Sequence, residues 1–272
     1  VNPDNQTVHY TFQSDFTDSS GNARNGTATG AVAGSTTSPP AYTYSNLPEN
    51  TIFNETDTYS QWWLQDGEWI MTPTWHDTFV SNKGWTQVGS QVIDEWATTN
   101  LVQYTNAKDD WIWKLLPIPI QGGKDWAVRV KWTHTSTSAT GGQYALLYLS
   151  NSASDPESSG VKSLGVHFAP HVDSIRVRTN DEGTKTYGTG AGGSYEGTDN
   201  WIHLYRSGTT LYIQLYADAT FTTTRGSLVS IAIPDNIKDI DLTYFSFGAD
   251  SEDEGTFTGS MDNLEIYNGV AL

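Results

Sequence analysis

The segment Trp126-Ala-Val-Arg-Val-Lys-Trp132 decides the fold class of this chain. Its apolar side chains recur at every second position from Trp126 to Trp132, while Arg129 and Lys131 lie between them. A period of two places the apolar residues on one face of a β-strand and the charged residues on the other. We therefore predict a strand with one buried face and one solvated face.

The same alternation recurs further along the chain, in residues 174–178, 211–216 and 263–267. Between Trp201–Arg206 and Thr209–Ala217 stands Ser207-Gly208, which is typical of a tight hairpin turn. Half-buried strands joined by short turns indicate antiparallel sheets packed face to face. We predict an all-β protein built as a two-sheet antiparallel β-sandwich.

Tryptophan is distributed unevenly. Ten of the eleven Trp residues lie between Trp62 and Trp132, and Trp201 is the exception. A chain of 272 residues can form one large sandwich. We expect a single domain over residues 1–272, in which residues 36–123 are a Trp-rich insertion or elaboration.

Charge and composition exclude several functions. The chain has 14 Lys and Arg residues against 31 Asp and Glu, a net charge of −17, which opposes binding to nucleic acid or to anionic lipid. It contains no Cys, so disulfides and thiolate metal sites are excluded. No apolar run is long enough to insert into a membrane. Asn-x-Thr sequons at Asn5, Asn25 and Asn54 hint at an exported protein, so we expect an extracellular, cell-surface or virion-surface location.

Three segments carry a resemblance to a known family. Residues 9–30 contain an aromatic strand, the turn Asp18-Ser-Ser-Gly-Asn22 and then Asn25-Gly-Thr27. Residues 257–272 contain a Gly-x-x-Asp turn and a strand that ends in Tyr267-Asn268. Residues 200–218 form a Trp-x-His strand, a short turn and a second strand. Together they resemble concanavalin A-like, laminin-G-like (LamG) jelly-roll domains. In that family the second strand of the hairpin ends near Asp-Gly, and here Ala219 follows Asp218 in place of the Gly.

The resemblance implies how the two ends of the chain meet. In such domains the first and last strands lie side by side, which predicts that His9–Phe12 pairs with Leu264–Tyr267. The family often holds a structural calcium ion where these ends meet. Carried over onto this sequence, its ligands are Asp18, Asn22 and Asp262, and their carboxylate and amide oxygens suit Ca²⁺. The alternative is an Asx-turn at Asp18 and a hydrogen-bonded Asp262 without metal.

Carbohydrate sites combine aromatic faces with amide and carboxylate groups, and the Trp-rich block has both. We predict a non-catalytic, lectin-like carbohydrate-binding or adhesion module whose partner is a glycan or polysaccharide. The alternative for these Trp residues is packing in the core. The predicted ligand-binding residues are Trp62, Trp63, Trp69, Trp75, Asp66 and His76.

Catalysis is less favoured by the sequence. A glycosidase needs two carboxylates at a set separation, and Glu55-Thr-Asp57 lacks the second Glu of the sandwich hydrolases. A polysaccharide lyase needs a His/Tyr pair with Arg and Gln. His167, His171 and Tyr187 exist, but the nearest substitute for an Arg-rich strand is Arg176 with Arg178 on one strand face. The question whether the protein is an enzyme stays open, and the sequence favours the answer no.

A structural role is the remaining alternative. An acidic, Cys-free sandwich suits a decoration or receptor-binding protein of a virus particle or a cell-surface layer. The Trp-rich block would then be the interface of a homo-oligomer or of a larger surface assembly, because Trp and Tyr are enriched at interface cores. The fold alone does not separate these functions.

Overall fold

The computed structural model describes residues 51–54, 60–65, 68–79, 84–88, 101–106, 111–137, 144–169, 174–192, 195, 197–247 and 257–270. In five short stretches it describes the backbone but not the side chains, namely 68–69, 101–106, 136–137, 144–145 and 257–258. The chain divides into two compact units, Val1–Asn54 with Gln61–Thr72, and Glu55–Ser60 with Pro73–Leu272. Each unit is described by itself.

The first unit contains a three-stranded antiparallel sheet of order β1-β2-β3. Its strands are β1 (Ile52–Asn54), β2 (Gln61–Gln65) and β3 (Glu68–Thr72). Along β2, Trp62 and Leu64 are buried whereas Trp63 is exposed. Adjacent residues of a strand point to opposite faces, so this sheet has one buried face and one open face.

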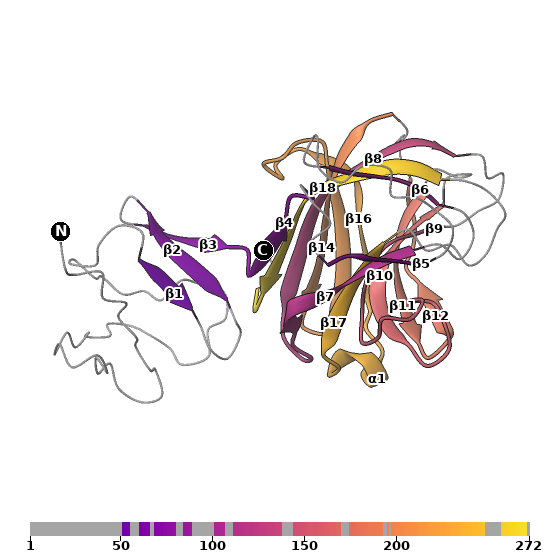
Figure 1. Ribbon diagram of the computed structural model, residues 1–272, viewed down its shortest axis with the longest axis horizontal. Coiled ribbons are helices and arrows are strands. Elements are labelled where there is room, and N and C mark those ends of the chain that lie inside the picture. Colours follow the sequence, from indigo (N-terminus) through magenta and orange to yellow (C-terminus); the bar gives the residue numbers. More distant parts are fainter. Residues whose placement is uncertain are drawn as a thin grey trace. The chain divides into compact units, whose positions relative to one another are not determined.

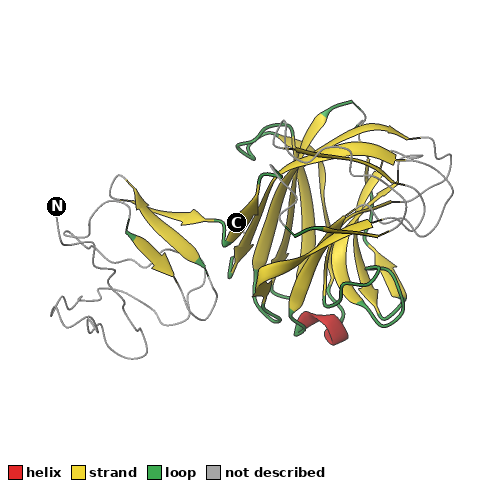
Figure 2. Cartoon of the chain, viewed as in Figure 1, coloured by secondary structure: helices red, strands yellow, loops and turns green. Residues whose placement is uncertain are grey.

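The second unit is an antiparallel β-sandwich of two large sheets (Figures 1 and 2). The eight-stranded sheet has the order β12-β11-β10-β9-β17-β7-β5, and β13 pairs with β11. Its strands are β5 (Thr86–Val88), β7 (Trp111–Ile120), β9 (Tyr144–Ser150), β10 (Lys162–Ala169), β11 (Ser174–Asp181), β12 (Thr184–Tyr187), β13 (Ala191–Gly192) and β17 (Leu242–Phe247).

The seven-stranded sheet has the order β16-β15-β14-β8-β18-β4, and β6 also pairs with β18. Its strands are β4 (Trp75–Asp77), β6 (Leu101–Asn106), β8 (Trp126–Thr137), β14 (Asp199–Ser207), β15 (Thr210–Tyr216), β16 (Thr224–Ala232) and β18 (Phe257–Asn268). One short helix, α1 (Asp235–Lys238), precedes β17. Within the part of the chain described above, no helix is long and apolar enough to cross a membrane.

The predicted alternation of β8 is confirmed. From Trp126 to Trp132 its apolar side chains are at most 1% exposed, and Arg129 and Lys131 between them are partly exposed. In β14 and β15 the apolar side chains also turn inward, and the hairpin closes at the pair Ser207–Thr210 through Gly208, whose φ is 59°. A positive φ favours glycine because it has no Cβ. The all-β sandwich prediction therefore holds.

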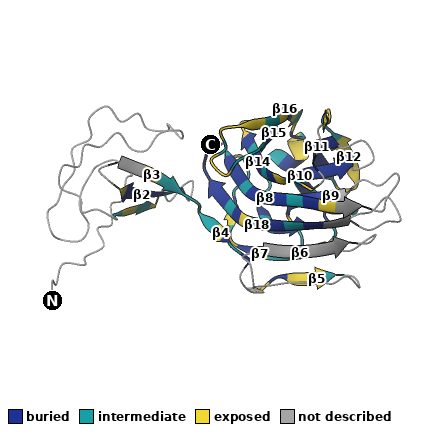
Figure 3. Cartoon of the chain, turned by 90° about the horizontal axis from the view of Figure 1, so that it is seen from above, coloured by how far each residue is buried: buried dark blue, intermediate teal, exposed yellow. Residues whose placement is uncertain are grey.

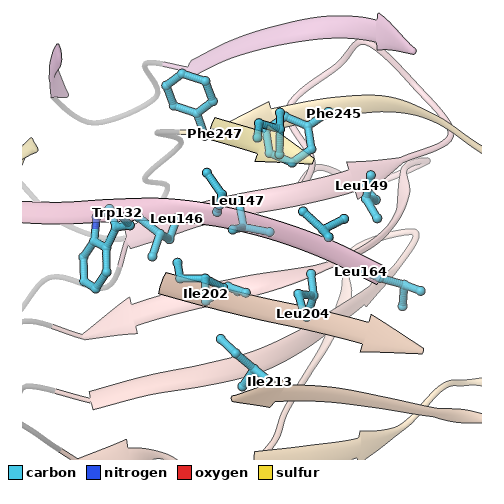
Figure 4. Close-up of a cluster of buried hydrophobic side chains, with 14 of the residues drawn as sticks. Trp132, Leu146, Leu147, Leu149, Leu164, Ile202, Leu204, Ile213, Phe245 and Phe247 are labelled. Atoms are coloured by element: carbon cyan, nitrogen blue, oxygen red, sulfur yellow. The ribbon is translucent and has the colours of Figure 1, made fainter. Parts of the chain in front are cut away.

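The core lies between the two sheets (Figure 4). Leu147, Leu164 and Phe245 enter it from the eight-stranded sheet, and Trp132 and Ile202 enter it from the seven-stranded sheet. Figure 3 shows the buried residues gathered along the strands of the sandwich. The outer face of each sheet is therefore where polar side chains from neighbouring strands can meet.

The predicted pairing of His9–Phe12 with Leu264–Tyr267 is wrong at Glu265 and Ile266. Glu265 and Ile266 pair with β8 on one edge, and Leu264–Ile266 pairs with β4 on the other edge. A strand has only two edges, so no third strand can pair there. His9–Phe12 itself lies outside the described residues. The segment after Thr72, which the sequence assigned to an insertion or an elaboration, supplies β4, β5, β6 and β7 to the sandwich.

Candidate functional site

The open face of the three-stranded sheet carries an exposed apolar row beside a polar row. Ile52 pairs with Trp63, and Trp63 pairs with Ile70, so the three side chains share a face. Their exposed fractions are 56%, 38% and 46%. We call this row with its polar neighbours, Asn54, Gln61 and Thr72, the Trp63 face.

The polar row is held together by side-chain hydrogen bonds. Gln61 Nε2 donates to Asn54 Oδ1 at 2.9 Å, and Thr72 Oγ1 donates to Gln61 Oε1 at 3.1 Å. These bonds fix the amide of Gln61 next to the ring of Trp63, two residues along the same strand. The Trp63 face therefore presents an indole ring with oriented amide groups beside it.

The remaining predicted ligand-binding residues are placed differently. Trp62 is buried on the opposite face of β2, and Trp75 is half-buried against the core of the sandwich, with Lys114 Nζ 5.0 Å from its ring. His76 is exposed on the outer face of the seven-stranded sheet, opposite Glu265. Asp66 and the side chain of Trp69 lie outside the described residues.

Of the predicted calcium ligands, Asp262 is described, and Asp18 and Asn22 are not. Asp262 lies in β18 beside an irregularity of its pairing with β8, and Asn263 has a φ of 50°. Burial raises the pKa of the Asp262 carboxyl, and its Oδ1 has no hydrogen-bond partner within the described part of the chain. A buried carboxylate oxygen of this kind fits a metal ligand. The described residues contain no group of three His, Cys, Asp or Glu that could hold a metal.

The outer face of the eight-stranded sheet carries a second polar site, centred on Glu157 in the turn after β9. Glu157 Oε1 accepts hydrogen bonds from Arg178 Nη1 and from Tyr148 OH, and Glu157 Oε2 accepts one from Lys185 Nζ at 3.1 Å. Glu157, Arg178 and Tyr148 are buried. We call these four residues, with His167, Arg176 and Tyr187, the Glu157 cluster.

Glycine makes room for this cluster. Gly165, Tyr148 and Arg178 stand in one cross-strand row. A Cβ on Gly165 would lie 2.6 Å from Cγ of Tyr148 and 2.4 Å from the carbonyl oxygen of Leu147. The ring of Tyr148 therefore occupies the space above Gly165, and this brings its hydroxyl to Glu157.

Hydrogen bonds from Asn180 and Ser163 hold the turn that carries Glu157. Asn180 Nδ2 donates to the carbonyl oxygens of Pro156, Ser158 and Val161, at 2.9–3.1 Å. Ser163 Oγ also donates to the carbonyl oxygen of Pro156, at 2.6 Å. Because these donors lie on β10 and β11, the turn is held against β11, which carries Arg176 and Arg178, and against its neighbour β10.

His167 and Arg176 form the next row of the cluster, as direct cross-strand partners. His167 is 1% exposed, its Nε2 lies 3.8 Å from Glu157 Oε1, and its ring centroid lies 5.5 Å from that of Tyr187. Burial lowers the pKa of His167 well below its usual value, and Arg178, Arg176 and Lys185 lower it further. The imidazole is therefore neutral at pH 7.

Sequence reasoning found only part of this cluster. It named His167, Tyr187, Arg176 and Arg178 as an incomplete lyase set, and the structure brings these four together. It missed Glu157, which comes from an irregular turn and meets Arg178 21 residues later in the chain. His171 lies outside the described residues.

Comparisons with known proteins bear on the fold. No family model matches the chain, and no curated protein matches it. The chain is similar to the VIP36 exoplasmic/lumenal domain bound to Ca²⁺ and Man3GlcNAc, with 15% sequence identity over 70% of this chain and 85% of that chain and a TM-score of 0.49. It is also similar to arcelin-5, a lectin-like defence protein from Phaseolus vulgaris, with 11% identity over 71% of this chain and 96% of that chain and a TM-score of 0.49. A variant of the GH43 protein BlXynB from Bacillus licheniformis is similar with 10% identity over 80% of this chain and 46% of that chain and a TM-score of 0.50.

At these identities the likeness concerns the fold alone. The second unit is an antiparallel β-sandwich of two large sheets. The narrower resemblance to laminin-G-like domains stays a prediction from the sequence.

Proposed function

We propose that the protein is a non-catalytic carbohydrate-binding module and that the Trp63 face receives a sugar ring. The observation that carries this proposal is the exposed indole of Trp63 beside the hydrogen-bonded row of Asn54, Gln61 and Thr72. An aromatic face packs against the apolar face of a pyranose, and amide groups bond its hydroxyls. Fixed amides lose little conformational entropy when a ligand binds.

The rest of the proposal follows from the sequence. The partner is a glycan or polysaccharide, and the location is extracellular, on a cell surface or on a virion. A structural calcium ion held by Asp18, Asn22 and Asp262 belongs to the same proposal. The unpartnered Oδ1 of Asp262, within the described part of the chain, supports it.

Assembly with other copies is the second candidate, and one observation favours it. Ile52 and Ile70 flank Trp63, so the exposed row is apolar from end to end. Contiguous exposed apolar surface often marks a protein interface. A decoration or adhesion protein could use this row to contact its neighbours.

A polysaccharide lyase is supported less well. The His167–Tyr187 pair with Arg176 and Arg178 supplies the expected residue types. A catalytic base must reach the proton that it removes, and His167 is 1% exposed. This burial favours binding over turnover.

The test uses Trp63→Ala, with Leu228→Ala as the control because Leu228 is an exposed apolar side chain in the sandwich. Wild type and both variants are screened on a glycan array and titrated with the best glycan by calorimetry. We expect Trp63→Ala to lose at least tenfold in affinity and Leu228→Ala to bind like wild type. Equal binding by Trp63→Ala would refute the proposal. A wild-type oligomer that Trp63→Ala converts to monomers, without any glycan signal, would establish the assembly alternative.

A further inference from the structure

We propose that the Trp63 face binds an extended, uncharged polysaccharide lengthwise, with the sugar chain running across β1, β2 and β3 and at least three of its sugar residues in contact. The inference rests on the proposed function, because it names the ligand of the same face. It adds the length of the ligand, its direction across the sheet, its shape and its charge.

The apolar row of this face is longer than one sugar ring. Ile52, Trp63 and Ile70 stand on three neighbouring strands as direct cross-strand partners. Such partners have Cβ atoms about 4.5–5.5 Å apart, so the row extends about 9–11 Å from Ile52 to Ile70. A single pyranose can cover the indole of Trp63, but it leaves both isoleucines in water. A ligand that uses the whole row must therefore continue on both sides of Trp63.

The polar row runs parallel to the apolar row. Asn54, Gln61 and Thr72 are direct cross-strand partners as well, each two residues away from the apolar residue of its own strand. The bonds from Thr72 Oγ1 to Gln61 Oε1 and from Gln61 Nε2 to Asn54 Oδ1 join them in one line across the three strands. A sugar chain has apolar ring faces and hydroxyl groups along its whole length. It therefore matches both rows when it lies in the direction in which they run.

The bonds within the polar row use only part of its hydrogen-bonding capacity. Each amide nitrogen carries two N–H groups and each amide oxygen has two lone pairs, whereas each of these bonds uses one of them. Asn54 is exposed, and Gln61 and Thr72 are partly exposed. Gln65 is exposed on the same face of β2, on the other side of Trp63. Hydroxyl groups of a ligand can thus bond amides on both sides of the apolar row.

The apolar row is open to solvent. Its three side chains are exposed, whereas Trp62 and Leu64 on the opposite face of β2 are buried. No part of the row has to be uncovered before a ligand can contact it.

The shape of the rows selects an extended chain. Direct partners on neighbouring antiparallel strands lie along a line perpendicular to the strands, so each row is nearly straight over its three residues. Cello-, xylo- and manno-oligosaccharides keep successive sugar rings in line, whereas malto-oligosaccharides curve. An extended chain can therefore contact both rows along their whole length.

Charge selects a neutral ligand. None of the six residues of the Trp63 face carries a charge, so the face offers no cation to a carboxylate or a sulfate group. The net charge of the whole chain is −17, which repels polyanions. Polyuronates and sulfated glycans are therefore disfavoured, and the ligand class is a neutral polysaccharide.

The experiment titrates the full chain with cello-, xylo- and manno-oligosaccharides of one to six sugar residues, followed by calorimetry. We expect the affinity for at least one series to rise at least tenfold from the monosaccharide to the trisaccharide, and to change little beyond the tetrasaccharide. Maltotriose, which is curved, and trigalacturonate, which is charged, should bind at least tenfold more weakly than the best trisaccharide. These titrations use the wild type, so they do not depend on the folding of a variant.

Two variants test the ends of the apolar row. Ile52→Ala and Ile70→Ala should each weaken binding of the best trisaccharide at least threefold. Leu228→Ala is the control, because it shortens an exposed apolar side chain of the sandwich, and it should bind like wild type. In isoleucine methyl NMR, the signals of Ile52 and Ile70 should both shift when the trisaccharide binds.

Chain length and Trp63→Ala separate this inference from the proposed function. A monosaccharide that binds as tightly as the trisaccharide, with binding lost in Trp63→Ala, would overturn the lengthwise chain and leave the sugar site standing. Trisaccharide binding that neither isoleucine variant weakens, trigalacturonate binding as tight as that of the neutral trisaccharide, or no binding of any series would also overturn the inference. Oligosaccharide binding that Trp63→Ala leaves unchanged would overturn both proposals.

Discussion

Glu157 and Arg178 form an ion pair whose side chains are 2% and 0% exposed. Both charged groups are almost completely shielded from water, and Lys185 and Tyr148 also donate hydrogen bonds to the carboxylate of Glu157. Breaking a buried ion pair costs more than the pair contributes, because the remaining charge stays buried. The pair therefore determines how the turn after β9 and the outer face of β11 respond to substitution.

Glu157→Gln should destabilise the protein by about 3–5 kcal/mol, because Arg178 stays buried while the carboxylate is removed. Urea unfolding followed by Trp fluorescence measures this free energy. Asp235→Asn is the matched control, because its carboxylate is 90% exposed and contacts Lys238 at 3.0 Å. An exposed pair contributes about 0–1 kcal/mol. Similar losses in the two variants would show that Glu157 is not buried as described.

Gly165→Ala should destabilise the fold through crowding, since its Cβ would lie 2.4 Å from a backbone oxygen and 2.6 Å from the Tyr148 ring. Overpacking costs about 1–3 kcal/mol or more. Gly192→Ala in β13 is the control, because no atom lies within 4 Å of its added Cβ. Differential scanning calorimetry should show a lower Tm for Gly165→Ala alone. A Tm equal to that of wild type would mean that Tyr148 does not lie over Gly165.

The free energy of unfolding should decrease as the pH is lowered, because of His203. Burial and, to a smaller extent, the positive charge of Arg129 lower the pKa of His203 to about 3, whereas the pKa is about 6.5 in the unfolded chain. Between these values the unfolded state binds more protons, so stability is full above pH 6.5 and decreases as the pH falls toward 3. The slope contributed by one such residue reaches about 1.4 kcal/mol per pH unit. His167, with its lowered pKa, acts in the same direction.

Unfolding free energies measured from pH 7 to pH 4.5 test this, above the range in which most carboxylates titrate. His203→Gln should reduce the slope, because it removes the histidine whose pKa burial lowers. His203 is packed against Tyr205 and Phe221, at ring distances of 4.6 and 6.1 Å. A slope that His203→Gln does not alter would mean that this histidine already carries its proton in the folded state.

Calcium should raise the melting temperature if Asp262 is a ligand, because an ion that binds only the native state stabilises it. We expect a chelator to lower the Tm by several degrees. Asp262→Ala should remove the response to calcium and cost about 1–3 kcal/mol. Melting curves that coincide in chelator and in calcium would eliminate the ion from this protein.

The sequence predicted the strands well because their signal is local. Alternation in Trp126–Trp132 and the turn at Gly208 specify a face and a hairpin from neighbouring residues alone. It could not assign Trp62 and Trp63 to buried and exposed positions, because adjacent residues of a strand differ only in which face meets the core. It placed the edges of β18 wrongly, since the pairing of Leu264–Ile266 with β4 joins segments that share no local pattern.

The position of β18 in the interior of its sheet has a consequence for synthesis. It follows every other described strand in the chain, yet it lies between β8 on one side and β4 and β6 on the other. While a ribosome is still translating the segment before Phe257, β4 and β6 lack the one strand with which they pair in the described part of the chain, and one edge of β8 stays open although β14 pairs with its other edge. The nascent chain must therefore wait for its last strand before the sheet can close, and contacts this distant in sequence form slowly. A chaperone that shields strand edges during that interval would raise the yield of this protein more than one that acts on the finished chain.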